Sequence, residues 1–192
     1  YLITRQEGGL LEAREILIAL LQGVGEIWPD GEWLSDTAIG DVGYHSLIRR
    51  DNITDGIIPF HKLSQWLAYS LIEPLSDAGI KVVNLDALTG LAEYRNGGLF
   101  IDTKTISLRD AEQATLAHCP KSSLVVEWRA LTVALLDQLA ESVRDQMGQN
   151  AEMLPLASVL QGGSWAAGRK IAKQLRDNGG PPILLSSSGT IF

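Results

Sequence analysis

Residues 123–136 read SLVVEWRALTVALL, and this stretch decides the fold. Its apolar residues cover nearly every side of a helix, which is typical of a helix that its neighbours bury. We expect the helix to extend over residues 123–147, with a solvent-facing second half. Since charged side chains are rarely buried without partners, Glu127 and Arg129 are predicted to form a structural ion pair or to meet a ligand or water in a cleft.

The helical spacing of apolar residues recurs along the chain. It predicts further helices over residues 10–21, 60–77, 88–95 and 108–118, and one that begins after Gly162 and Gly163. Short extended pieces are expected at residues 80–83 and 99–102 and, as a terminal segment, at residues 183–185 with 189–192. A long loop is expected at residues 28–55. Pro74 supplies no backbone donor and is expected to kink or divide the helix over residues 60–77. Many helices and few short extended pieces favour a mainly α fold over a wound α/β sheet.

Composition limits the classes of protein to consider. The chain has 192 residues, 45% of them hydrophobic, which is enough to bury the core of one helical domain spanning residues 1–192. Acidic residues exceed basic ones by 23 to 16 and the basic ones are scattered, which argues against binding to nucleic acid or to an anionic membrane. No apolar stretch approaches the ~20 residues that span a bilayer, and nothing at the start resembles a signal peptide. We therefore expect a cytoplasmic protein.

The chain carries none of the common cofactor or metal motifs. It has no dinucleotide fingerprint, Walker loop, His-Glu-x-x-His or Gly-x-Ser-x-Gly sequence. Cys119 is the only cysteine, so neither an internal disulfide nor a cysteine-based zinc site can form. The neighbouring His118 is interpreted as the end of a helix. We predict no cofactor and no metal.

Polar side chains stand among apolar ones in residues 58–70, IPFHKLSQWLAYS. Such groups need partners, because an unpaired polar group out of water costs about 1–3 kcal/mol. Lys62, Gln65 or Trp66, Tyr69 and Glu73 follow at three- and four-residue intervals and share one face of the predicted helix; this face lines a cavity or forms an ordinary solvated surface.

A second segment of this kind covers residues 88–98, LTGLAEYRNGG. Glu93 and Arg95 flank Tyr94, and Asn96 begins an Asn-Gly-Gly sequence that is expected to end a helix or to let backbone approach a ligand closely. Because two such segments lie close together in the sequence, we predict that they share one pocket.

The pair Gly162 and Gly163 is expected to open a helix whose first amides point at an anion. Arg169 and Lys170 follow one to two turns later, which would complete a phosphate cradle. The alternative is an ordinary helix start, since a glycine pair before a helix is common.

Five motifs, in this order, resemble the uracil catabolism protein 4 family. They are PFHKLSQWLAYSLIEPL (59–75), LTGLAEYRNGG (88–98), VVEWRALTVALLDQLA (125–140), QGGSWAAGRKIA (161–172) and SGTIF (188–192). The resemblance covers about residues 28–192 and implies the C-terminal half of a longer protein, whose N-terminal half packs against this chain. Ser188 stands where the family has Asp, and Ser164 where it has Thr.

A narrower likeness concerns the segments FHKLSQ and LTGLAEYR. They are similar to the FxKxxQ and LTxFADYR pattern of the queuosine-salvage nucleosidases, with Glu93 in place of an Asp. Those nucleosidases are helical proteins related in shape to DNA glycosylases, and they hydrolyse the bond between base and ribose in a 5′-phosphorylated nucleoside. The likeness implies a DNA-glycosylase-like helical fold and a small, nucleotide-derived substrate of the uracil pathway.

That reaction assigns roles to the candidate residues. A carboxylate near the anomeric carbon stabilises the oxocarbenium-like centre, and Glu93 is the first choice. Lys62 or Arg95 would hold a phosphate or a ring-opened carboxylate. The aromatic side chains would stack on a planar group, and Gln65 would hydrogen-bond its edge. The predicted catalytic residues are Glu93 and Lys62, and the predicted substrate-binding residues are His61, Gln65, Trp66, Tyr69, Tyr94, Arg95, Asn96, Glu127, Arg129, Gly162, Gly163 and Arg169.

Two other classes of function remain open at this point. One is a ring-opening or deaminating hydrolase that uses a metal-activated water, with ligands drawn from His45, His61 and His118. The other is a non-catalytic partner that shelters or channels intermediates of the pathway.

Overall fold

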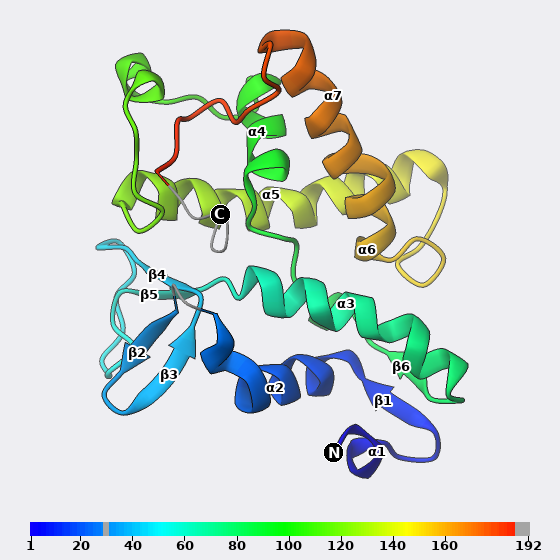
Figure 1. The fold of residues 1–192 in the computed structure, drawn as a ribbon. Coiled ribbons are helices and arrows are strands. Elements are labelled where there is room, and N and C mark those ends of the chain that lie inside the picture. Colours follow the sequence, from blue (N-terminus) through cyan, green and yellow to red (C-terminus); the bar gives the residue numbers. More distant parts are fainter. Residues whose placement is uncertain (29–30, 187–192) are drawn as a thin grey trace.

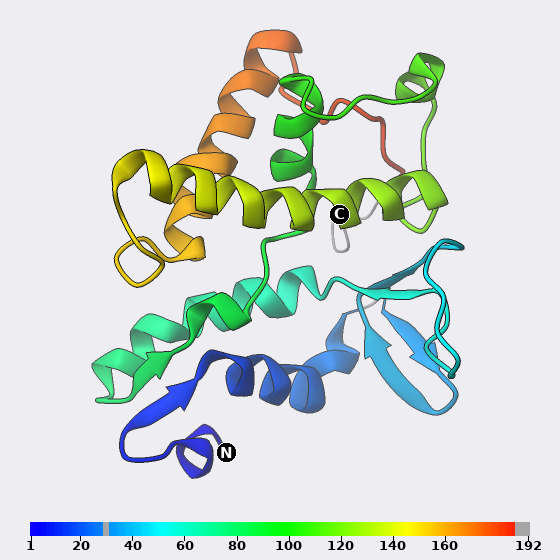
Figure 2. The same ribbon diagram turned by 180° about the vertical axis from the view of Figure 1, so that it is seen from behind.

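The computed structural model describes residues 1–28 and 31–186, and it shows a mainly α protein whose elements form two layers (Figure 1). The lower layer in this view holds the N-terminal elements through β6, and the upper layer holds α4 to α7. The view from behind in Figure 2 shows the same separation, with residues 84–93 rising from the lower layer to the upper one.

The N-terminal layer consists of two longer helices with short strands at their ends. Its helices are α1 (Leu2–Arg5), α2 (Ala13–Val24) and α3 (Lys62–Asp77), and its strands are β1 (Leu10–Glu12), β2 (Glu32–Leu34), β3 (Thr37–Gly40), β4 (Val42–Tyr44), β5 (Ile57–Pro59) and β6 (Lys81–Val83). Strand β1 pairs with β6 in parallel, while β2 with β3 and β4 with β5 form antiparallel pairs.

The C-terminal layer is helical. It contains α4 (Tyr94–Asp102), α5 (Ser123–Met147), α6 (Leu156–Val159), a π turn (Leu160–Ser164) and α7 (Trp165–Leu175). Three short 3-10 turns occur elsewhere, at Gly25–Ile27, Leu85–Ala87 and Ala111–Thr115.

The long buried helix predicted over residues 123–147 is confirmed as α5. Its buried residues include Val126, Trp128 and Leu136, and it ends where Gly148 adopts a left-handed conformation with φ of 62°. Its apolar residues are not buried on every side, since Leu131 remains 41% exposed. Helix α5 therefore forms the floor of the C-terminal layer, on which α4 and α6 pack.

In the N-terminal layer the structure corrects two expectations and excludes one of the two alternatives for Pro74. The helix expected from residue 10 begins at Ala13, because residues 10–12 pair with β6 as a strand. Residues 28–55, expected as a loop, contain the strands β2, β3 and β4. Helix α3 runs through Pro74 without dividing.

The prediction for residues 88–102 was wrong in a way that matters for the site. Residues 88–93 are not helical, and residues 99–102, expected as a strand, belong to α4. Gly97 lies in the first turn of α4 and does not end a helix, because α4 packs so closely on α5 that a Cβ at Gly97 would lie 2.6 Å from Thr132 Oγ1. Tertiary packing thus explains a glycine that local sequence rules assign to a terminus.

Two later expectations also change. Residues 108–118 form only the 3-10 turn at Ala111–Thr115, after which His118 pairs with Leu185 across an isolated parallel bridge. Gly162 and Gly163 do not precede a new helix, because α6, the π turn and α7 form one continuous helical path.

Among the described residues, buried apolar side chains form four groups, one of which consists of Val125, Trp128 and Ile183. The N-terminal layer buries Leu11, Ala13, Ile16, Ala68 and Leu88, and the C-terminal layer buries Phe100, Leu136, Ala140, Leu156, Val159 and Leu160. Between the layers lies a smaller group of Phe60, Ala92 and Val126. Phe60 and Ala92 stand just before α3 and α4, so this group fixes the starts of both helices relative to α5.

Candidate functional site

A cavity of about 600 Å³ lies where α3 faces the C-terminal layer. Ligand sites in proteins commonly enclose about 300–1,000 Å³. The lining residues come from α3, from the segment leading into α4, and from the α6 to α7 path; they are Lys62, Leu63, Trp66, Tyr69, Ser70, Glu73, Leu91, Glu93, Asn96, Ala157, Leu160, Gln161 and Trp165. The two polar segments that the sequence singled out therefore share one pocket.

Lys62 is the first residue of α3, and its side chain is the unusual group of the cavity. The residue is only 8% exposed, and its ammonium has no hydrogen-bond or ion-pair partner within residues 1–28 and 31–186. The pKa of Lys62 is lowered from 10.5 to about 8. Burial is the main cause and the positive charge of Arg129 adds to it, while Asp41 and Glu93 act in the opposite direction. A mostly buried lysine that lines a cavity and forms no ion pair there is suited to bind an anionic ligand.

Glu93 is the residue immediately before α4 and caps that helix. Its carboxylate accepts hydrogen bonds from the backbone N–H groups of Arg95, at 2.9 Å, and Asn96, at 2.6 Å. Burial raises the pKa of Glu93, while these two hydrogen bonds and the charge of Lys62 act in the opposite direction. The cap fixes the carboxylate in one orientation at the cavity wall, where it interacts electrostatically with Lys62.

Arg129 lies behind this wall and is 1% exposed. Its guanidinium forms a bidentate pair with Asp41, with N–O distances of 2.8 and 2.7 Å. Its Nε donates to the carbonyl oxygen of Ala92 at 3.3 Å, and its guanidinium carbon lies 4.0 Å from the centre of the Phe60 ring. Of the alternatives for Arg129, the buried structural ion pair is the one observed, although its partner is Asp41 and not Glu127.

Two arginines stand beside the cavity at Trp165, which lines it and is 36% exposed. The Arg95 guanidinium lies 5.7 Å from the Trp165 ring centre and 5.0 Å from that of Tyr94, and the Arg169 guanidinium lies 4.8 Å from the Trp165 ring centre. Cation–π contacts of this kind hold a guanidinium in place while leaving its N–H groups available. Arg95 and Arg169 thus place positive charge beside an aromatic wall.

Comparisons with known proteins show the family of the chain. A family model described as "Protein of unknown function (DUF1688)" matches residues 1–192. The chain belongs to the DUF1688 family. Among curated relatives, it is 46% identical to "Protein urg3" of Schizosaccharomyces pombe, over 86% of this chain and 41% of the relative. It is 39% identical to "Uracil catabolism protein 4" of Lachancea kluyveri, over 98% of this chain and 48% of the relative.

The DUF1688 chain therefore spans about half the length of these curated relatives. The resemblance to the uracil catabolism protein 4 family is confirmed. No solved structure matches the chain.

Several predicted substrate-binding residues of the DUF1688 chain have structural tasks. Gln65 is buried outside the cavity lining, and its Oε1 accepts from the Thr89 N–H at 3.2 Å. Tyr69 lines the cavity, but its hydroxyl donates to the Thr89 carbonyl at 3.1 Å, and burial raises its pKa. Asn96 accepts from Ser164 Oγ at 2.9 Å and donates to the Leu91 carbonyl at 3.3 Å.

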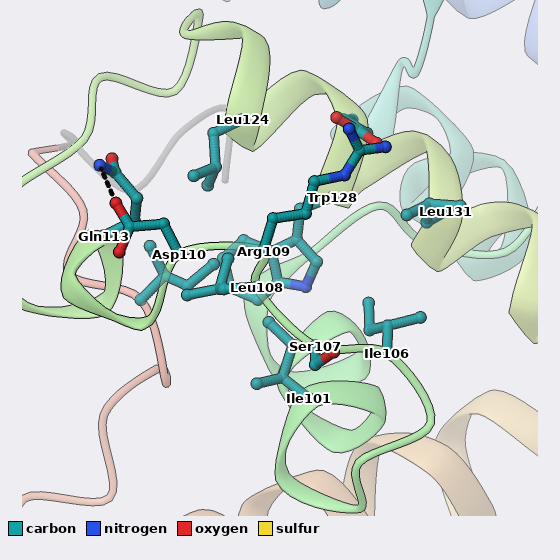
Figure 3. Close-up of a pocket in the computed structure, with 12 residues that line it drawn as sticks. Ile101, Ile106, Ser107, Leu108, Arg109, Asp110, Gln113, Leu124, Trp128 and Leu131 are labelled. Atoms are coloured by element: carbon teal, nitrogen blue, oxygen red, sulfur yellow. Dashed lines mark hydrogen bonds between the residues drawn. The ribbon is translucent and has the colours of Figure 1, made fainter.

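Other predicted residues lie elsewhere. His61 precedes α3 in a left-handed conformation with φ of 49°; its Nδ1 is buried, and burial lowers its pKa. Glu127 is exposed, lies 3.9 Å from His45, and lines a second cavity of about 310 Å³. In Figure 3 that second cavity is bounded by mostly apolar side chains such as Ile101 and Leu131, with Asp110 and Gln113 hydrogen-bonded to each other on one wall.

Gly162 and Gly163 border a third, apolar hollow of about 410 Å³ on the other side of the π turn. The predicted phosphate cradle is absent there, because Trp165 N–H donates to the Leu160 carbonyl and the helical path supplies no free N-terminal amides. Ser188 and the segment 189–192 lie outside the described residues.

Three residues of the DUF1688 site went unrecognised in the sequence: Asp41, Gln161 and Trp165. Trp165 had a usable signal, because Arg169 follows it at the four-residue spacing of neighbours on a helix. Asp41 stands in a stretch interpreted as loop and is 88 residues from its partner, so no local pattern marks it.

The structure also bears on membranes and metals. Among residues 1–28 and 31–186 no helix is both long and apolar enough to cross a membrane. Within the same residues, no three or more His, Cys, Asp or Glu side chains gather in a way that suits a metal ion.

Proposed function

We propose that this chain carries the active site of an uracil-catabolism enzyme that hydrolyses the N-ribosidic bond of a ribosyl 5′-phosphate intermediate. The pathway part of the proposal draws on the name of one relative, "Uracil catabolism protein 4". The reaction part is supported by one observation above the others. It is that Lys62, a mostly buried lysine, and Glu93, the carboxylate that caps α4, line the same cavity, whose volume of about 600 Å³ suits a nucleotide.

Glu93 suits the role of the catalytic carboxylate. Breaking a C1′–N bond leaves positive charge on the sugar, and a fixed carboxylate stabilises that charge more than it stabilises the neutral substrate. Because burial raises its pKa, Glu93 can also accept a proton from the attacking water. The water oxygen then bonds to C1′, the electrons of the C1′–N bond pass to the leaving nitrogen, and that nitrogen takes up a proton.

Lys62 suits the leaving group or an anionic part of the substrate. With a pKa of about 8, its ammonium is mostly protonated at neutral pH and still gives up a proton more readily than an exposed lysine. Arg95 and Arg169 would hold the 5′-phosphate, since a guanidinium offers paired donors to an anion. Trp66 is 59% exposed and Trp165 lines the cavity beside it, so these indoles would face a planar base or ureido group.

The test is to incubate the full-length protein, without added metal, with uridine 5′-phosphate and with its ring-opened derivatives. Release of ribose 5-phosphate is followed by mass spectrometry. We expect release from at least one substrate and a loss of at least about 100-fold in kcat for Glu93→Gln, the size typical of removing one electrostatic stabiliser.

Glu127→Gln is the matched control, because it makes the same substitution at an exposed carboxylate outside the cavity. It should retain activity. Full turnover by Glu93→Gln would contradict the proposed mechanism. Absence of ribose 5-phosphate with every substrate would favour a metal-dependent hydrolase of the ring or a non-catalytic partner.

A further inference from the structure

Asp41 binds the entry to α3 through three consecutive backbone amides. Its carbonyl oxygen accepts from the N–H groups of Phe60, at 3.0 Å, and His61, at 2.9 Å. Its carboxylate Oδ2 accepts from the N–H of Lys62 at 2.9 Å. These bonds hold His61 in its left-handed conformation, and that tight turn delivers Lys62 to the cavity.

The same carboxylate pairs with Arg129, which in turn reaches the other side of the site. Arg129 binds Asp41 at both guanidinium ends and donates through Nε to the carbonyl of Ala92, the residue before Glu93. One buried ion pair therefore binds the backbone at two places. Asp41 binds it at Lys62, the first residue of α3, and Arg129 binds it at Ala92, next to the Glu93 that caps α4.

We infer that the Asp41–Arg129 pair positions Lys62 and Glu93 relative to each other across the cavity. The two charges of the pair also act on the proton of Lys62, which gives the inference a measurable consequence. The inference deepens the proposed function and rests on it only for the expected effect on kcat. The geometric consequence, and the effect on the charge of Lys62, hold for any ligand of the cavity.

The pair acts on Lys62 through two opposite charges. Arg129 disfavours the ammonium, whereas Asp41 and Glu93 favour it; His61 is the neighbouring titratable group, and its pKa is itself lowered by burial. Removing Arg129 alone leaves the Asp41 carboxylate, so Lys62 should hold its proton to higher pH. Removing Asp41 alone leaves the guanidinium, so Lys62 should lose its proton at lower pH. A role limited to folding gives no such opposite pair of shifts.

The experiment measures Lys62 directly in the full-length protein. Lys62 is labelled with a small amine-reactive reagent over a range of pH, and the modified peptide is quantified by mass spectrometry. The wild-type midpoint is expected at about 8. We expect Arg129→Gln to raise the midpoint and Asp41→Asn to lower it, each by roughly one unit, and the double variant to return towards wild type.

Arg176 and Asp102 supply a matched control, because they form a second bidentate pair with distances of 2.8 and 2.6 Å away from the cavity. Asp102→Asn should lower thermal stability without moving the Lys62 midpoint. If a single variant of the Asp41–Arg129 pair does not fold, Arg129→Lys tests the inference in its place. Lysine keeps the positive charge but cannot form the bidentate pair with Asp41, so the Lys62 midpoint should stay near that of the wild type while kcat falls.

Midpoints that shift in the same direction for both single variants, or that do not shift, would overturn the inference. Opposite shifts in a protein that turns over no substrate would leave the inference standing and remove the proposed function. Opposite shifts together with a displaced pH profile of kcat would support both.

Discussion

At the scale of single residues, Lys62 places a positive charge in a mostly buried site. The contribution of this residue to the free energy of unfolding therefore depends on pH. Its folded-state pKa is about 8 against an ordinary 10.5, so between these values the unfolded chain binds more protons than the folded one. The free energy of unfolding should therefore rise as pH rises from about 8 to 10.5, by an amount on the order of 3 kcal/mol for this residue.

Lys62→Met should remove that rise, because the methionine side chain does not titrate. Urea denaturation between pH 7 and pH 10.5, with the exposed Lys170→Met as control, measures the difference. A Lys62→Met protein whose stability follows the same pH curve as wild type would show that the buried lysine is not the cause.

Helical spacing was enough to predict which residues of α3 line the cavity. Lys62, Trp66 and Tyr69 share one face of α3, and that face lines the cavity. Glu127 and Gln65 do not line this cavity, because sequence shows that a residue is polar without showing where its side chain points. Gln65 points to the Thr89 backbone, and Glu127 points to a different cavity.

At the scale of elements, Gly168 allows α7 to lie against α4. A Cβ at this position would overlap the carbonyl oxygen of Arg95, so the two helices must separate to admit any other residue. Gly168→Ala should destabilise the protein by about 1–3 kcal/mol through overpacking, although alanine favours a helix by about 1 kcal/mol.

Gly162→Ala is the matched control in the same helical path, because its Cβ would meet no atom within 4 Å. It should be neutral or slightly stabilising. Both are measured by chemical denaturation, and equal effects would show that the contact with Arg95 does not constrain α7.

The elements that could be predicted are those fixed by their own sequence. Helix α5 was predicted correctly because its apolar pattern extends over many turns. The start of α4 was not, because Glu93 acts as an N-cap and Gly97 fits against Thr132. Both depend on contacts with the rest of the chain, which no local rule contains.

At the scale of the whole molecule, the cavity takes walls from both layers and includes two of the five tryptophans. Binding of uridine 5′-phosphate should change the fluorescence of Trp66 and Trp165, since a stacked base replaces water beside each indole. Excitation at a wavelength that the nucleotide does not absorb isolates this signal.

Trp66→Phe and Trp165→Phe should each diminish the change. Trp33→Phe should leave it, because Trp33 is 55% exposed and does not line the cavity. A change that survives in the protein lacking both Trp66 and Trp165 would place the nucleotide elsewhere.

The π turn between α6 and α7 has a consequence best put in genetic terms. A turn closed from Trp165 to Leu160 holds one residue more than an α turn, as if a single codon had been inserted into an ordinary helix. Each residue turns a helix by about 100°. Deleting one codon here would rotate α7 by that angle relative to α6, so Trp165 would leave the cavity lining and Arg169, which packs on it, would move with it. The insertion or deletion of one codon would therefore change the positions of Trp165 and Arg169 together.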